Sequence, residues 1–162
     1  MPAWLRLDGK RVGYRIRDLM AGTGYELPRH DEGAGGYDVR PDGARIVFTH
    51  DAAAVPRMGN PLSLAQIDLK SRRITPVASD PGWDLGAPRY SPDGAAIVYG
   101  AQTEPFFYAD RVKLMRYDRK TGAHAELCAG WDRSANGWEF DGAGRIVLLA
   151  EDDARTKLFR VA

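Results

Sequence analysis

Four times along this chain an Asp-Gly pair lies beside a short apolar run that resembles a β-strand. The segments are LDGKRVGY (7–14), PDGARIVF (41–48), PDGAAIVY (92–99) and DGAGRIVLL (141–149). Their Asp residues are 34, 51 and 48 residues apart, and the last two intervals fit a four-stranded β-propeller blade of roughly 40 to 50 residues. The recurrence predicts a repeat architecture, because one such unit alone cannot bury its apolar face.

The local chemistry of each copy favours a hairpin. Pro can preset φ of a turn residue, Asp can accept hydrogen bonds from nearby backbone, and Gly tolerates positive φ. A PDG turn between two β-rich runs therefore predicts two antiparallel strands. The runs that follow, IVF, IVY and IVLL, are continuously apolar, as expected for strands packed between neighbouring sheets.

The copies divide into about two complete blades and two partial ones. The second copy supplies GGYDVRP, ARIVFTH, LAQIDL and RITPVAS, and the third supplies APRYSP, AAIVYGA, VKLMRYD and HAELCAG. The first copy offers one convincing hairpin and the fourth offers three strands. We therefore predict an all-β fold: a single partial β-propeller domain over 1–162, built of four-stranded antiparallel blades that start near positions 4, 37, 87 and 136.

A propeller needs about 4 to 8 blades to close its ring. We expect further blades or another chain to complete this one, because terminal blades would otherwise expose unpaired edges and apolar faces. A twisted open stack with unusual ends is a third possibility.

Composition excludes several classes of function. The chain has 162 residues, of which 44% are apolar, and 23 basic residues balance 22 acidic ones. Such a balance produces no net positive electrostatic potential that would attract nucleic acid or an anionic membrane. No apolar run approaches the ~20 residues that span a bilayer, and no N-terminal leader pattern is visible. A lone cysteine, Cys128, forms no intrachain disulfide, so we expect a cytoplasmic protein.

The second half of the chain carries more specific motifs. Over 109–161 a strand of the form LxxYDRxTG (114–122), a WDRS segment (131–134), a strand that ends in AED (150–152) and a closing LFRV strand (158–161) follow in order. This order resembles the propeller of prolyl-oligopeptidase-family serine peptidases, especially the acylaminoacyl-peptidase and dipeptidyl-peptidase V branch. The resemblance extends from about position 37 onward.

The resemblance implies an enzyme in which a propeller covers an α/β-hydrolase domain and admits only short peptides. This chain shows no hydrolase domain and no catalytic residues, because none of its five serines lies in a G-x-S-x-G elbow. Ser91, in YSPDG, is interpreted as a turn residue. The histidines at positions 30, 50 and 124 are scattered, so no general base is assigned. Whether the chain acts as an enzyme stays open at this point.

Arg111, Asp132 and Arg133 are the candidate binding residues. In Asp110-Arg111 and in Asp132-Arg133 an acidic residue precedes an arginine. The arginine can form bidentate hydrogen bonds with a carboxylate of a neighbouring blade or of a peptide. Inter-blade bracing is the favoured interpretation, and peptide contact at a channel rim is the alternative. The aromatic group at 106–108 is likewise interpreted as packing rather than as a binding patch.

The remaining motifs predict no cofactor and no metal. DEGAGG (31–36) lacks the lysine and hydroxyl of a phosphate loop and is interpreted as a connection between blades. The acidic run 151–153 lacks the spacing of a calcium loop and predicts a solvated hairpin turn. Cys128 is expected to be a buried residue of the strand HAELCAG.

Two functions from different classes remain. The first is a non-catalytic, substrate-gating propeller segment of an acylaminoacyl-peptidase-like serine peptidase that acts on short peptides. Its partner would be a missing α/β-hydrolase domain or further blades. The second is a stand-alone, WD-like protein or peptide interaction module that closes its ring as a homo-oligomer.

Overall fold

The structure is a computed structural model that describes most of the chain from Gly36 onward. It covers 36–51, 62–79, 83–104, 107 and 109–161, with position 51 and two short N-terminal strands given as backbone alone. The predicted loop DEGAGG therefore lies outside the described residues except for Gly36, and so do His30, Phe106 and Tyr108. Every regular element within these ranges is a β-strand.

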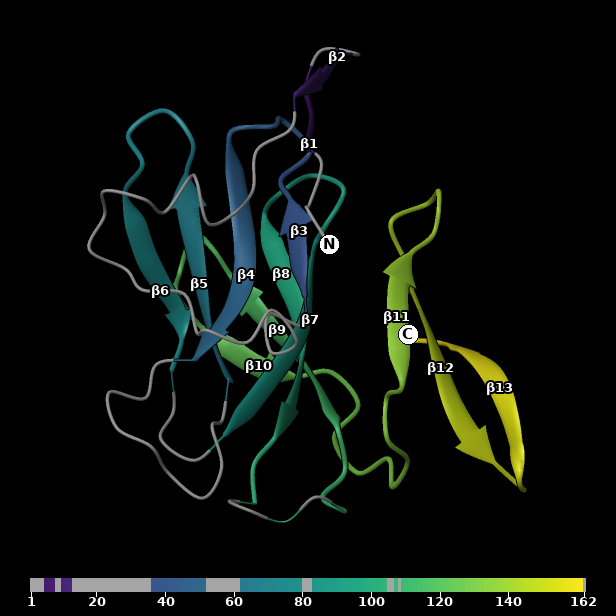
Figure 1. Ribbon diagram of the computed structural model, residues 1–162. Helices are drawn as coiled ribbons and strands as arrows, with labels where there is room; N and C mark the ends of the chain where they lie inside the picture. The colour runs from purple at the N-terminus through teal and green to yellow at the C-terminus, as the bar shows by residue number, and fades with distance from the viewer. Residues whose placement is uncertain are drawn as a thin grey trace.

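The strands form an N-terminal hairpin and three larger antiparallel sheets, which we call the second, third and fourth blades (Figure 1). The hairpin pairs β1 (Leu5–Leu7) with β2 (Lys10–Val12). The second blade contains β3 (Tyr37–Val39), β4 (Arg45–Asp51), β5 (Leu62–Asp68) and β6 (Ile74–Ala78). The third contains β7 (Asp84–Tyr90), β8 (Ala96–Gln102), β9 (Lys113–Asp118) and β10 (His124–Glu126). The fourth contains β11 (Gly137–Phe140), β12 (Ile146–Asp152) and β13 (Arg155–Arg160).

Each sheet is a meander in which sequence neighbours are also neighbours in space. The predicted all-β partial propeller, with two four-stranded blades and two incomplete ones, is confirmed. How the chain divides into domains stays a prediction.

Glycines with positive φ close the three Asp-Gly hairpins. Gly43, Gly94 and Gly144 have φ of 70°, 66° and 76°, and each backbone N–H donates to the carbonyl three residues earlier at 2.7–2.9 Å. Residues with a Cβ rarely adopt this conformation, which explains why glycine recurs there.

The fourth hairpin is built differently from the copy that the sequence predicts. Asp42 and Asp93 lie inside their turns, directly before the left-handed glycine, whereas Asp141 opens its turn and Gly144 closes it. Asp141 is therefore not the structural equivalent of the other two aspartates. The resulting loop between paired residues is also one residue shorter, because Asp141 pairs with Arg145 whereas Ser91 pairs with Ala96.

Strand register aligns the three blades residue by residue. Leu64, Leu114 and Leu158 occupy one equivalent position, because they pair with the fifth residue after the hairpin in each sheet: Thr49, Gly100 and Leu149. Since side chains alternate across a sheet, all three leucines lie on the face that each blade turns toward the blade that follows it.

The second and third blades share one apolar core. Val47, Leu64 and Val77 of the second blade pack against a larger set from the third blade. That set comprises Leu85, Tyr90, Ile97, Tyr99, Ala101 and Met115. Burial of these side chains, each at most 8% exposed, supplies the main force that holds the two sheets face to face.

Polar contacts at the inner strands fix how these two blades meet. The Asp38 carboxylate of β3 accepts a 2.7 Å hydrogen bond from the Tyr90 backbone N–H of β7. Burial raises the pKa of Asp38, and the hydrogen bonds it accepts oppose that effect. Gly36 approaches a bulge in β7 so closely that an added Cβ would lie 3.1 Å from the Cα of Ala87.

The third and fourth blades meet in a second apolar core. Trp138, Leu148 and Ala150 of the fourth blade pack against Val98 and Leu114 of the third. The Trp138 ring lies over Gly100, where an added Cβ would come within 2.6 Å of the ring. A glycine inside a buried strand is therefore explained by the close approach of the next blade.

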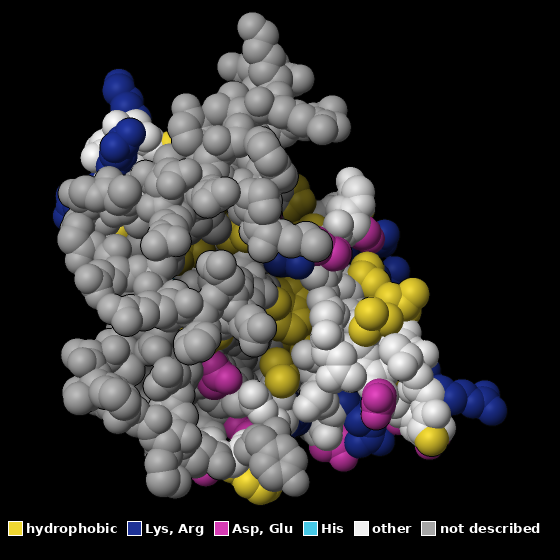
Figure 2. Space-filling view, in the orientation of Figure 1, with side chains coloured by type: hydrophobic (Ala, Val, Ile, Leu, Met, Phe, Trp, Pro, Cys, Tyr) yellow, Lys and Arg dark blue, Asp and Glu magenta, His cyan; other side chains and the backbone are white. Residues whose placement is uncertain are grey.

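The outward face of the fourth blade carries the same leucine position, and no sheet of the described residues covers it. Leu64 is 0% exposed and Leu114 is 2% exposed, whereas Leu158 is 71% exposed and its neighbour Leu149 is 41% exposed. Figure 2 shows a patch of hydrophobic side chains in the part of the view where β11 lies in Figure 1. Val147 and Leu149 lie on one face of β12, and Leu158 of β13 pairs with Leu149. We call the surface formed by Val147, Leu149 and Leu158 the open face.

Truncation of two equivalent leucines should change the stability of the protein by different amounts, because one lies in a covered interface and the other on the open face. We expect Leu64→Ala to lower the free energy of unfolding by about 2–5 kcal/mol, because it leaves a cavity between two sheets. Leu158→Ala should change it by less than about 0.5 kcal/mol, because that side chain is already in solvent. Urea unfolding of both variants measures the difference, and equal losses would mean that the open face is covered in the purified protein.

A second prediction concerns two equivalent turns. Asp68 and Asp118 each accept hydrogen bonds from the backbone and hydroxyl of Ser71 and Thr121, respectively. The next residue is left-handed in both turns, with φ of 56° at Arg72 and 75° at Gly122.

We expect Arg72→Gly to stabilise the protein by about 0.5–1 kcal/mol, because a left-handed residue with a Cβ is strained. The reciprocal change Gly122→Ala should destabilise it by about 1 kcal/mol. Thermal unfolding of the two variants tests the pair, and a loss of stability in Arg72→Gly would contradict the account of the turn.

Candidate functional site

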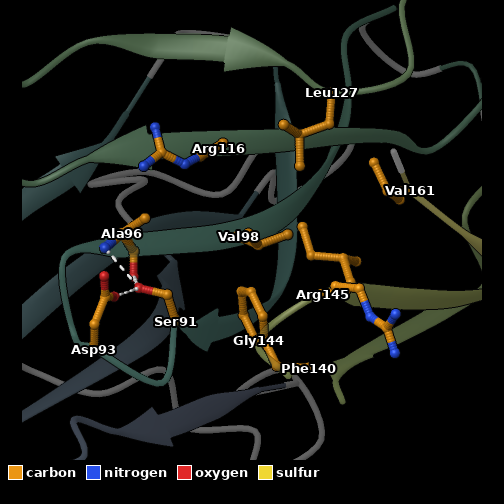
Figure 3. A pocket seen from close by; sticks show the side chains of 11 residues that line it. Ser91, Asp93, Ala96, Val98, Arg116, Leu127, Phe140, Gly144, Arg145 and Val161 are labelled. Carbon is orange, nitrogen blue, oxygen red and sulfur yellow. Dashed lines mark hydrogen bonds between the residues drawn. The ribbon is translucent and has the colours of Figure 1, made fainter. Parts of the chain in front are cut away.

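A pocket of about 370 Å³ lies between the third and fourth blades, near the ends of the strands that carry the Asp-Gly hairpins. Its apolar wall is formed by Val98, Leu127, Phe140, Ile146 and Val161. Figure 3 shows Asp93 and Arg116 on one side of it and Val161 and Arg145 on the other, with Val98 between them. The pocket thus combines an apolar wall with charged groups of both signs.

A difference between equivalent residues of the third and fourth blades explains why this pocket exists. Tyr117 pairs with Ile97 in the third blade, and Val161 occupies the equivalent place, since its N–H donates to the Ile146 carbonyl. Tyr117 packs against the core between the second and third blades. The smaller Val161 leaves space between the third and fourth blades, which sequence patterning alone did not reveal.

The charged groups around the pocket already have partners. Arg145 lies 2.7 Å from the Asp141 carboxylate, and Arg116 lies 3.5 Å from Asp118. The Ser91 hydroxyl donates to Asp93 at 2.5 Å, and this bond is the main cause of the lowered pKa of the Asp93 carboxyl. The arginines and the carboxylate that line the pocket are therefore each engaged with a residue of their own blade.

Ser91 has the turn role that the sequence predicted. Besides donating to Asp93, its hydroxyl oxygen accepts a 2.8 Å hydrogen bond from the Ala96 backbone (Figure 3). These contacts hold the hydroxyl within the hairpin, as in a turn that a serine and an aspartate close together.

Arg111 connects the third blade to the segment that leads to the fourth. Its guanidinium lies 3.0 Å from the Glu126 carboxylate and donates to the Trp131 carbonyl at 2.5 Å. The neighbouring acid, Asp110, is not its ion-pair partner; the Asp110 carboxylate instead accepts hydrogen bonds from the backbone of Thr103 and Glu104.

Arg133 lies in the same connecting segment and reaches the fourth blade. Its guanidinium contacts the neighbouring Asp132 at 2.5 Å and Asp152 at 3.1 Å. Lys157 contacts the same Asp152 carboxylate at 2.5 Å, so two cations share one acid at the end of β12. Both interpretations of Arg111, Asp132 and Arg133, inter-blade bracing and peptide contact, stay predictions.

Two expectations about this region need correction. Strand β10 ends at Glu126, so Cys128 lies in the following turn and is half-buried rather than part of a strand. The strand stops there because the chain turns toward Trp131, whose N–H donates to the Cys128 carbonyl. The acidic run 151–153 is only in part a turn: Glu151 and Asp152 belong to β12, and Asp153 begins the hairpin.

Both histidines of the described residues lie in strands, and His50 of β4 pairs with Ser63 of β5. His124 lies 2.8 Å from the Tyr99 hydroxyl and stacks on Tyr117, and His50 is buried in the second blade. Over the described ranges, no group of three or more His, Cys, Asp or Glu side chains is placed to hold a metal ion. The same part of the chain contains no helix that is long and apolar enough to span a membrane.

The cluster around Asp152 predicts a specific pH dependence. The Lys157 hydrogen bond, followed by that from Arg133, lowers the pKa of Asp152 below its ordinary 3.8. A lowered folded-state pKa contributes stability above pH 3.8 that is lost as the pH falls through the folded-state value. Asp152→Asn should therefore be less stable than the wild type at neutral pH, and the difference should shrink below pH 4.

Urea unfolding between pH 2 and pH 8 measures this difference. Glu151→Gln is the matched control, because Glu151 is exposed and adjacent. A gap between wild type and Asp152→Asn that stays constant over the whole pH range would contradict the assigned ion pairs.

Comparisons with known proteins identify related sequences. A probable dipeptidyl-peptidase 5 of Aspergillus flavus is 29% identical over 144 residues, which cover 80% of this chain and 19% of the relative. The corresponding protein of Aspergillus terreus is 30% identical over 136 residues, which cover 76% of this chain and 18% of the relative. The chain thus spans about a fifth of the length of the curated relatives it matches. No profile of a known protein family matches it.

Solved structures support the fold. TolB from Acinetobacter baumannii aligns with a TM-score of 0.56 and 22% identity over 80% of this chain and 30% of its own. The tricorn protease aligns with the same TM-score and 15% identity over 90% of this chain and 14% of its own. At these identities the likeness concerns architecture alone. Together with the Aspergillus relatives, it confirms that this chain is similar to the β-propeller portion of a prolyl-oligopeptidase-family serine peptidase.

Proposed function

We propose that this chain is the non-catalytic propeller segment of a serine peptidase of the acylaminoacyl-peptidase and dipeptidyl-peptidase type. In this role it limits access to an α/β-hydrolase domain so that short peptides reach the active site. The observation that carries the proposal is the similarity to dipeptidyl-peptidase 5 over 80% of the chain. The match covers 19% of that relative, which leaves room there for a separate catalytic domain.

The geometry of the described residues supports a positioning role rather than a catalytic one. Their polar side chains are engaged in turns and ion pairs, as at Ser91 and Asp152. Packed sheets of this kind are stiff because apolar side chains interdigitate between them. A stiff wall can exclude folded proteins by size, whereas catalysis needs a nucleophile with an adjacent base.

The open face supports the expectation of a covering partner. Val147, Leu149 and Leu158 repeat a surface that is covered at both internal blade interfaces. An apolar surface of this kind is stabilised when another sheet covers it. In the proposed peptidase, that sheet is a further propeller blade.

Peptidase assays with short and long substrates test the proposal. We expect the purified 162-residue chain to show no hydrolysis of chromogenic dipeptide or acyl-amino-acid substrates. If the gene continues in frame, the longer product should hydrolyse dipeptides. Leu158→Glu in that product should increase its cleavage of long peptides relative to dipeptides, because a charged residue loosens the blade contact. Lys120→Glu, at an exposed turn, is the control.

Serine-inhibitor-sensitive turnover by the 162-residue chain alone would contradict the proposal. An unchanged ratio of long-peptide to dipeptide cleavage in Leu158→Glu would contradict the gating role and leave the family similarity intact.

The exposure of Leu158 also favours a second function, a stand-alone module that binds proteins or peptides and closes its ring by self-association. Sedimentation analysis distinguishes the two. Self-association predicts a concentration-dependent oligomer that Leu158→Glu converts to a monomer, whereas the peptidase segment predicts a longer gene product.

A further inference from the structure

Arg40 of the second blade and Arg119 of the third meet at the Gly94 turn, beside the Tyr90 ring, and the charge of Arg45 of the second blade acts on the same ring. The Arg119 guanidinium carbon lies 5.7 Å from the centre of the Tyr90 ring, and its Nη1 donates to the Gly94 carbonyl at 2.6 Å. Arg40 passes over the same glycine, since its Nε lies 3.1 Å from the place where a Cβ would stand. Positive charges on Arg40 and Arg45 add to burial in lowering the pKa of Arg119.

The carboxylates nearby do not balance this charge. Arg40 lies 3.3 Å from Asp42, and Arg45 lies 3.4 Å from Asp68. No ion pair joins Arg119 to a carboxylate of the described residues, and its buried Nε lacks a hydrogen-bond acceptor there. The Asp38 carboxylate, which also lies beside Tyr90, accepts hydrogen bonds from the backbone N–H groups of Val39 and Tyr90. Among the described residues, Arg119 is therefore the arginine of the three without an ion-pair partner.

The hairpin itself does not need these arginines. The third blade forms the same turn with Ser91 in the place of Arg40 and Ala96 in the place of Arg45, with matching backbone hydrogen bonds of 2.9 Å and 3.0 Å. Both arginine side chains are also partly solvent-accessible, at 29% and 35% exposure. The turn therefore forms with or without arginine at these two positions.

We propose that Arg40, Arg45 and Arg119 bind an oxyanion, the carboxylate or phosphate group of a small ligand. Guanidinium groups form bidentate, charge-assisted hydrogen bonds to such groups, and a bound anion would offset the repulsion among the three cations. The cation–π contact with Tyr90 and the bond to Gly94 hold Arg119 in place before the anion arrives. This site is separate from the pocket between the third and fourth blades and does not depend on the proposed peptidase role.

Titration with small anions tests the site. Inorganic phosphate and acetate, each added at constant ionic strength made up with chloride, should shift the NMR signals of the arginine Nε–H groups in a saturable way. Phosphate binding that is stronger than acetate binding assigns a phosphate-bearing ligand, and the reverse order assigns a carboxylate. Constant ionic strength removes the general screening effect of added salt.

The variant Arg40→Ser/Arg45→Ala copies the third blade and is therefore expected to fold. It should bind the preferred anion at least about tenfold more weakly, since each charge-assisted hydrogen bond contributes on that scale. Arg155→Gln, at an exposed position of β13, is the control and should bind like the wild type. Anion shifts that do not saturate, or that are equal in all three proteins, would overturn the proposal.

Discussion

Apolar packing between the faces of neighbouring sheets is the interaction on which the rest of this structure depends. The leucine position of each blade shows it directly, because Leu64 and Leu114 are buried by the following blade and Leu158 is not. Among the described strands, no backbone hydrogen bond of a sheet joins one blade to another, so side-chain burial and a few polar contacts such as Asp38 to Tyr90 must hold the blades together.

This construction also determines where the chain can bind other molecules. A repeat whose members differ slightly leaves gaps or surplus charge at particular interfaces. Val161 in the place of Tyr117 opens a pocket between the third and fourth blades. Arg40 and Arg45, in the places of Ser91 and Ala96, bring cationic groups to the preceding interface. Both features arise from departures from the repeat.

The repeat made the architecture predictable from the sequence, but not every local detail. Short apolar runs separated by Asp-Gly turns predicted the strands of the second and third blades, because the apolar pattern and the turn chemistry are local properties of the sequence. The alignment of Asp141 with Asp42 and Asp93 was wrong, since the left-handed glycine of that hairpin is Gly144. Strand β10 ended earlier than expected and left Cys128 in a turn, where the path of the chain to the next blade outweighs strand preference.

The sequence by itself determined the all-β fold, the blade length and the resemblance to a peptidase propeller, because each is encoded in spacing and short motifs. Tertiary structure alone decided which partners the charged residues take. Arg111 pairs with Glu126 and not with the adjacent Asp110, and Arg119 contacts Tyr90, which lies 29 positions earlier in the chain. Such contacts depend on how separate strands are placed in space, which no local pattern of residues specifies.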